Sequence, residues 1–229
     1  MAPLHSDLFP VHIPEYDDEQ AVLAKYHAAA IARINETLSN NPWLSPETLE
    51  KSTQRIQCEN SSLTVKRKKL YQLADSFNKA IAGSVACRVG CAHCCSMITL
   101  IYEHEAKAMA QASGRPMKQV KYKPRAAVLE ASMKFFGLPC PFLQDDCCSI
   151  YEDRPIICRL HHSFNDNSSQ CDMSRPRDEM LGVSALNPDC IEQPYHALNL
   201  AFQPREPWGA VQDFFPEESE ALKLGNPEQ

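Results

Sequence analysis

The clustering of the cysteines constrains the fold of this chain more than any other feature. The 229 residues contain 11 cysteines, and nine of them lie between Cys87 and Cys171. A first block holds Cys87, Cys91, Cys94 and Cys95, and a second block holds Cys140, Cys147, Cys148 and Cys158. If the first block is even loosely helical, its spacing places several sulfurs on one face within two turns. Thiolates arranged in this way suit zinc or another soft or borderline metal.

The expected compartment favours metal binding over disulfides. The N-terminus lacks a basic segment followed by an apolar one, so it does not resemble a secretory signal. No run of about 18 apolar residues is present, so no membrane-spanning helix is expected. We therefore expect a cytoplasmic protein without membrane contact, in which thiols stay reduced. The formal net charge of −6 makes nucleic acid an unlikely partner.

The pattern predicts a mainly α fold: an N-terminal helical scaffold followed by a metal-organised, loop-rich cysteine-cluster domain with little β structure. Helical periodicity is clear over residues 17–40, ahead of Pro42, and over residues 63–81, ahead of Gly83. Between these, Ser45 and Pro46 predict the start of another helix that runs to about Ile56. The predicted division is a flexible arm (1–16), the helical scaffold (17–84), the cysteine-cluster domain (85–175) and a C-terminal extension with an acidic tail (176–229).

Regular structure becomes sparse within the cysteine region. A short β-rich run over residues 97–101 leads into a helix that should end near Gly114, and a second helix is predicted over residues 123–136. Residues 138–175 show little periodicity, which is unusual inside a compact domain and points to a metal as the organising element. The last 25 residues contain three prolines and many acids, and we expect a peripheral tail.

Several residues near the cysteines invite specific interpretations. Adjacent side chains diverge, so Cys94 and Cys95 are expected either to bind two different metals or to supply one ligand and one contact to a ligand. The same holds for Cys147 and Cys148. Buried thiolates need compensating charge, which Arg88, Arg154 and Arg159 could provide as neighbours of the expected ligands. His93 and His161 are more readily hydrogen-bond neighbours than ligands. The remaining acids of this region are expected in turns or in ion pairs with arginines, and Arg154-Pro155 is expected to form a rigid corner that positions Cys158.

Three features outside the cluster have simpler interpretations. The basic run from Lys66 to Lys69 is expected to be a solvated helix face. Cys58 and Cys190 are expected to be small buried hydrophobic residues. None of these features is assigned to the metal site.

The cysteine region resembles the bacterial YkgJ-like cysteine-cluster family, which is described as a zinc- or iron-chelating domain with a CxxCxxCC motif. The resemblance rests on the first block, on Cys140-Pro-Phe-Leu, on the string Cys148-Ser-Ile-Tyr-Glu-Asp-Arg-Pro-Ile-Ile-Cys158-Arg, and on the loop that ends at Cys171. The first spacing has three residues where the motif has two. The resemblance implies eight metal ligands, with Cys147 as an extra: Cys87, Cys91, Cys94, Cys95, Cys140, Cys148, Cys158 and Cys171.

The resemblance does not decide whether the protein only binds metal or also catalyses a reaction. The function expected first is binding of zinc, iron or an iron–sulfur cluster, such as a 4Fe–4S cluster, by these cysteines. The alternative is an S-adenosylmethionine-dependent lysine N-methylase with an iron–sulfur cluster, since part of the family resembles flagellin lysine N-methylases. No separate methyl-donor motif is present, and whether the protein is an enzyme stays uncertain. The spacing of Cys87, Cys91 and Cys94 also matches radical S-adenosylmethionine enzymes, but no strand–helix repeat follows it. Thiol redox or metal-carrier activity is a further possibility that no residue selects.

Overall fold

The computed structural model describes residues 17–88, 90–175, 182–186 and 188–216. These residues form a mainly helical protein with two small two-stranded sheets, which confirms the predicted fold class. None of the described helices combines the length and apolar character that a bilayer-spanning helix needs. The predicted arm (1–16) and the end of the predicted tail (217–229) lie outside the described residues.

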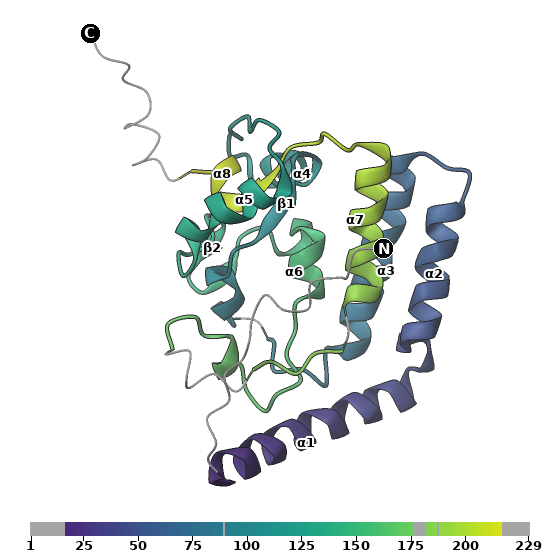
Figure 1. The fold of residues 1–229 in the computed structure, drawn as a ribbon, viewed down its shortest axis with the longest axis vertical. Helices are drawn as coiled ribbons and strands as arrows, with labels where there is room; N and C mark the ends of the chain where they lie inside the picture. The colour runs from purple at the N-terminus through teal and green to yellow at the C-terminus, as the bar shows by residue number, and fades with distance from the viewer. Residues whose placement is uncertain (1–16, 89, 176–181, 187, 217–229) are drawn as a thin grey trace.

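The N-terminal helices form where the periodicity predicts them. Helix α1 spans Asp17–Asn40, the short 3-10 helix η1 spans Pro42–Leu44, α2 spans Pro46–Cys58 and α3 spans Leu63–Ile81. The Ser45 side chain accepts a hydrogen bond from the amide of Thr48, as expected of a residue that caps a helix N-terminus. Helices α2 and α3 stand side by side, and α1 runs across one end of them (Figure 1).

A late segment of the chain completes this helical layer. Helix α7 spans Asp189–Phe202 and packs against both α2 and α3. Its buried residues Ile191, Tyr195 and Leu198 join one hydrophobic core with residues of α2 and α3. The scaffold is therefore built from both ends of the described chain.

The second part of the molecule is a small layer around a second core. Strand β1 (Leu100–Tyr102) leads into helix α4 (Glu103–Ser113), and Gly114 ends that helix with a φ of 70°. Helix α5 (Arg125–Ser132) continues as the 3-10 helix η3 (Met133–Phe135), so the helix predicted over 123–136 is present in two pieces. Strand β4 (Trp208–Ala210) pairs antiparallel with β1, with Ile101 opposite Gly209, and is followed by the short helix α8 (Val211–Phe214).

The irregular region contains only short elements. Strands β2 (Leu143–Gln144) and β3 (Cys147–Cys148) form a hairpin, and the 3-10 helix η4 (Tyr151–Asp153) precedes helix α6 (Ile156–Leu160). Two further 3-10 helices carry cysteines: η2 (His93–Ser96) and η5 (Ser169–Cys171). This sparse structure agrees with the lack of periodicity in the sequence.

Two expectations about surface segments are wrong. Residues 208–215 are not a peripheral tail, because β4 pairs with β1 and Phe214 and Phe215 are buried in the second core. The run from Lys66 to Lys69 is not simply a solvated face. Lys66 is buried and donates to the carbonyl of Gln57, and Arg67 forms an ion pair with Glu206.

A buried carboxylate connects the two parts of the molecule. The two carboxylate oxygens of Glu105, on α4, accept hydrogen bonds from the Tyr71 hydroxyl at 2.7 Å, the Ile156 amide at 3.1 Å and the Tyr102 amide at 2.9 Å. Burial, together with the Glu105 carboxylate, raises the pKa of the Tyr71 hydroxyl well above its ordinary value. Glu105 thus fixes the start of α6 relative to α3 and α4.

We expect Glu105→Gln to lower the free energy of unfolding by about 2 kcal/mol, because one amide nitrogen cannot accept the hydrogen bonds that a carboxylate oxygen accepts. Urea unfolding followed by circular dichroism measures this loss. The control is Glu103→Gln, which removes a pair with the exposed Lys107 and should cost less than about 0.5 kcal/mol. Equal losses in the two variants would contradict the role given to Glu105.

Candidate metal centre

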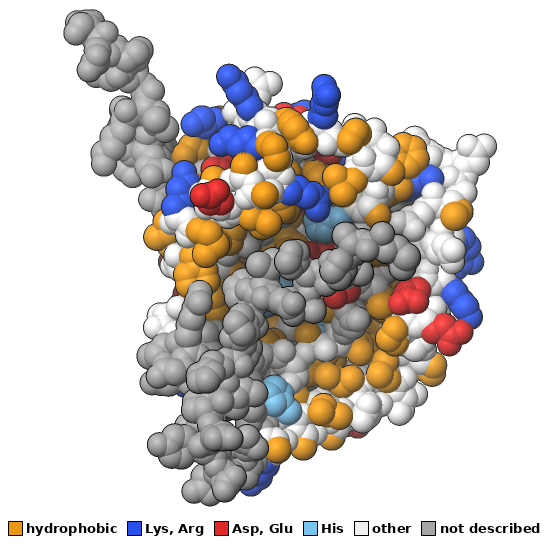
Figure 2. Space-filling model, viewed as in Figure 1, with side chains coloured by type: hydrophobic (Ala, Val, Ile, Leu, Met, Phe, Trp, Pro, Cys, Tyr) orange, Lys and Arg blue, Asp and Glu red, His pale blue; other side chains and the backbone are white. Residues whose placement is uncertain are grey.

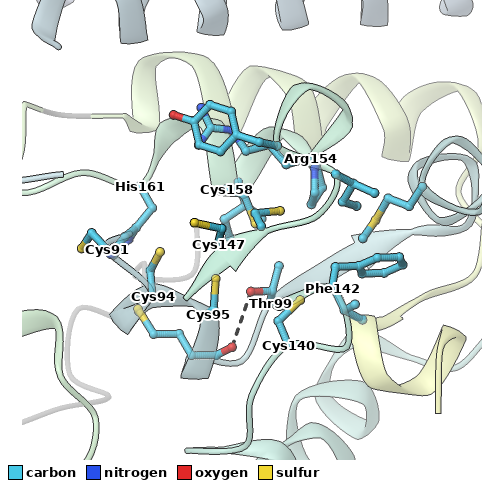
Figure 3. A pocket seen from close by; sticks show the side chains of 18 of the residues that line it. Cys91, Cys94, Cys95, Thr99, Cys140, Phe142, Cys147, Arg154, Cys158 and His161 are labelled. Atoms are coloured by element: carbon cyan, nitrogen blue, oxygen red, sulfur yellow. Dashed lines mark hydrogen bonds between the residues drawn. The ribbon is translucent and has the colours of Figure 1, made fainter. Parts of the chain in front are cut away.

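Seven thiols line one cavity of about 340 Å³. The cavity lies between η2, the β2–β3 hairpin and α6, and its other walls are mainly apolar. Figure 3 shows Cys94, Cys95 and Cys140 on one side of the cavity, with Cys147 and Cys158 facing them. The cysteines of the lining are Cys91, Cys94, Cys95, Cys140, Cys147, Cys148 and Cys158.

The first block reaches the cavity through tight local turns. Gly90 has a φ of 84°, a left-handed conformation that residues with a side chain rarely adopt, and the amide of Cys91 bonds to the carbonyl of Arg88. The chain then enters η2, where the carbonyl of Cys95 accepts from the amide of Cys140 at 2.7 Å. This backbone bond ties the first cysteine block to the second.

The hairpin places the adjacent pair Cys147 and Cys148. Its two turn residues, Asp145 and Asp146, have φ values of 48° and 57°, which fits a two-residue hairpin turn and confirms these acids as turn residues. Cys148 lies opposite Leu143 and packs against the second core, whereas Cys147 is exposed. Both nevertheless contribute to the lining of the cavity. The resemblance treats Cys147 as an extra cysteine, whereas the structure places it among the thiols of the cavity.

Helix α6 presents Cys158 from the scaffold side. Pro155 precedes the helix, and Ile156 and Leu160 are buried in the core formed with α3 and α7. Cys158, between them in sequence, faces the cavity instead. The corner predicted at Arg154-Pro155 therefore orients Cys158, with the amide of Ile156 held by Glu105.

Cys87 and Cys171 do not line this cavity. They lie near Cys91 and Cys94, two cysteines of the first block that do line it. Ser163 connects Cys87 to Cys171: its carbonyl accepts from the amide of Ala86, and its hydroxyl bonds to the Cys171 thiol. The thiols of Cys87 and Cys171 interact electrostatically with one another and with Cys91 and Cys94. Cys94 and Cys148 lie near enough to Cys140 and Cys158 to raise their pKa values, so Cys94 has neighbours in both sets of thiols.

Burial raises the pKa of several of these thiols, so they carry their protons near pH 7 in the absence of metal. Desolvation raises the pKa of Cys140 to about 11 and that of Cys171 to about 12, and it raises the pKa of Cys158 well above the ordinary value. For Cys94 the hydrogen bond with Cys95 is the largest cause of a raised pKa, followed by burial. A metal cation attracts thiolates and draws them together. Neutral thiols without a cation experience no such attraction.

The described thiols do not converge on one position that a metal ion could occupy. Within the part of the chain that the structure describes, no group of three His, Cys, Asp or Glu side chains is arranged so that it could hold a metal ion as placed. The chemistry of the donor set nevertheless fits a thiophilic metal, because most side chains of the cavity that can bind a metal are cysteines. Binding would require the thiols to lose protons and move together.

One of the three predicted arginines is well placed to balance thiolate charge. Arg154 lines the cavity and lowers the pKa of Cys87, Cys94 and Cys158, although burial outweighs this effect. Its guanidinium lies 3.8 Å from the centre of the Tyr151 ring, and its buried Nε has no hydrogen-bond partner among the described residues. Arg88 also lines the cavity, whereas Arg159 is engaged with Asp75 and with the carbonyls of Arg154 and Glu152.

The two candidate histidines differ in position. His161 lines the cavity beside Cys91 in Figure 3, and its buried Nε2 has no hydrogen-bond partner within the described chain. Burial lowers the pKa of His161, which leaves a neutral ring. His93 instead lines a second, more polar cavity together with Asp146 and Asp172. No signal in the sequence distinguishes the two histidines.

The cysteines outside the pattern lie away from the centre. Cys190 is buried in the scaffold core as predicted. Cys58, at the end of α2, is exposed, so the prediction of a buried residue is wrong for it.

Comparison with known proteins identifies the cysteine region. Residues 86–177 match the family model CxxCxxCC, described as "Putative zinc- or iron-chelating domain". The matched region is less than half of the chain and is similar to this family of metal-chelating domains. No curated protein and no solved structure matches the chain. The domain covers the first and second cysteine blocks and Cys171, and supports metal binding as the general function.

Proposed function

We propose that the protein chelates zinc or iron in a reducing compartment such as the cytoplasm, and that the metal organises residues 85–175. The observation that carries this proposal is the lining of one cavity by seven thiols from three separate segments. Short elements hold these segments, so ligand–metal bonds can add to the folding energy. Metal binding is then a structural requirement of the domain.

We further propose that the eight predicted cysteines divide into two four-thiolate sites. One site would take Cys87, Cys91, Cys94 and Cys171, and the other would take Cys95, Cys140, Cys148 and Cys158. The electrostatic neighbours of Cys171 support the first group, and the bond between the Cys95 carbonyl and the Cys140 amide supports the second. Because adjacent side chains diverge, Cys94 and Cys95 would each serve one site.

The residues around the thiols fit this role. Arg154 would offset the negative charge that several thiolates accumulate, and His161 would donate a hydrogen bond to a thiolate or add a nitrogen ligand. Apolar walls from Ile98, Phe142 and Ile157 would limit water around the bound metal. The metal itself would supply cross-links between the cysteine segments.

The proposal is tested by elemental analysis and absorbance of protein purified without oxygen. Zinc with no visible absorbance supports closed structural sites. Iron with acid-labile sulfide supports an iron–sulfur centre and makes S-adenosylmethionine-dependent N-methylation the activity to assay next. A well-folded protein that contains neither metal, and that takes up none when zinc or ferrous iron is added, would refute metal chelation.

We also expect metal binding to release protons. The raised pKa values of about 11 for Cys140 and about 12 for Cys171 mean that these thiols carry protons near neutral pH. Each ligating cysteine must lose its proton, so a four-thiolate site should release about four protons per metal ion. Metal affinity should therefore fall as the pH is lowered, because protons compete for the thiolates.

A weakly buffered solution with a pH indicator measures this release during zinc titration of the reduced, metal-free protein. Cys58→Ser is the matched control and should release the same number of protons, because the exposed Cys58 lies outside both groups. Zinc uptake without proton release would show that ligands other than neutral thiols bind the metal.

A further inference from the structure

A second distinctive feature of the molecule is the stretch between Arg115 and Lys134. This stretch contains six lysines and arginines but only one acid, Glu130, in a chain whose formal net charge is −6. It comprises the extended segment after α4, then α5 and η3. Figure 2 shows blue and orange side chains interspersed over the upper part of the molecule, where Figure 1 places α4 and α5.

Three lysines of this stretch form no ion pair within the described residues. Lys118, Lys121 and Lys123 are exposed, and none has an ion pair among the described residues. The two arginines behave differently. Arg115 donates to the carbonyl of Pro141, and Arg125 donates to the Tyr102 hydroxyl and lies over the Trp208 ring. The free positive charge is therefore carried by lysines.

Large apolar side chains of the same stretch are also exposed. Leu129 is 51% exposed and Met133 is 55% exposed, one helical turn apart on α5 and η3, while Val128 and Ser132 on the neighbouring face are buried. Tyr122 (49% exposed) lies between Lys121 and Lys123. Half of the large hydrophobic residues that are exposed in the described chain lie in this stretch or within four residues of its end. They are Tyr122, Leu129, Met133, Phe136 and Leu138.

We propose that this lysine- and apolar-rich surface docks on an anionic lipid bilayer. Lysines near such a bilayer gain roughly 1 kcal/mol each from the surface potential, and apolar side chains enter the headgroup boundary. Protein interfaces favour arginine and are depleted in lysine, whereas here the exposed cations are lysines. Phosphate binding to nucleic acid would use the lysines but would leave Leu129 and Met133 unexplained. The docking is peripheral and needs no spanning helix.

Co-sedimentation with vesicles tests this proposal, using phosphatidylcholine alone and phosphatidylcholine mixed with phosphatidylglycerol. The wild-type protein should bind only the anionic vesicles, and added salt should weaken the binding. The combined variant Lys118→Glu, Lys121→Glu, Lys123→Glu should bind at least about tenfold more weakly. The control variant Lys25→Glu, Lys68→Glu, Lys79→Glu has the same charge change on exposed positions of α1 and α3, and should retain most of the binding.

A second variant separates lipid docking from general attraction to polyanions. Leu129→Ser combined with Met133→Ser keeps the charge and alters only exposed side chains, and it should weaken vesicle binding severalfold. Binding to a DNA duplex that matches vesicle binding and is insensitive to this variant would overturn the proposal. So would an absence of binding to anionic vesicles, or equal losses in the two lysine variants.

Discussion

Replacing Cys158 or Cys94 with serine is expected to remove metal and folding stability together. A structural zinc site contributes on the order of 10 kcal/mol of folding free energy, and a lost thiolate sacrifices much of it. Under the two-site proposal, Cys158→Ser should reduce the metal content by about half. Cys94→Ser should cost at least as much, because Cys94 has neighbours in both sets of thiols.

Metal content by elemental analysis and soluble yield, measured for both variants, check this prediction. Cys58→Ser makes the same change at an exposed thiol and should leave metal content and yield unchanged. Unchanged metal stoichiometry in both Cys94→Ser and Cys158→Ser would contradict the ligand assignment. Loss of metal in Cys58→Ser would mean that the cluster extends beyond the two groups.

Chelation of the bound metal should loosen one part of the protein far more than the other. Hydrogen exchange followed by mass spectrometry should show strong deprotection of residues 87–95, 140–148 and 169–171 after the metal is removed. The regular structure of these segments is limited to short strands and 3-10 helices. The expected change is large because bonds to the metal would cross-link segments that short elements alone hold in place.

Helices α2, α3 and α7 provide the internal control for this experiment. Their buried residues, including Leu49, Phe77 and Tyr195, belong to one core and lie outside the cysteine segments. The amides of these helices should keep most of their protection when the metal is removed. Uniform deprotection of the whole chain would instead show that the scaffold cannot fold without the metal.

Local signals predicted the helices of the scaffold well. Ser45 and Pro46 define the start of α2, and Gly114 ends α4, because capping and a left-handed φ depend on residues close in sequence. The apolar stripe that includes Leu70, Phe77 and Ile81 predicted the buried face of α3. The cysteine spacing predicted metal ligands in both blocks, and both blocks contribute to the lining of one cavity.

Contacts between distant segments could not be predicted in this way. The pairing of β4 with β1 depends on residues more than a hundred positions apart, and nothing within 205–215 identifies its partner. The burial of Lys66 depends on Gln57 and on Phe202, which comes from another helix. The inclusion of Cys147 in the cavity depends on the hairpin turn, which places both adjacent thiols at one opening.

The late position of α7, β4 and α8 in the chain also affects how the protein is synthesised. Both hydrophobic cores include residues from this segment, such as Tyr195 in one and Phe214 in the other. All nine clustered cysteines leave the ribosome before these residues do. The nascent chain must therefore carry its thiols through translation before either core can close, and metal loading during synthesis would have to occur on an incomplete fold.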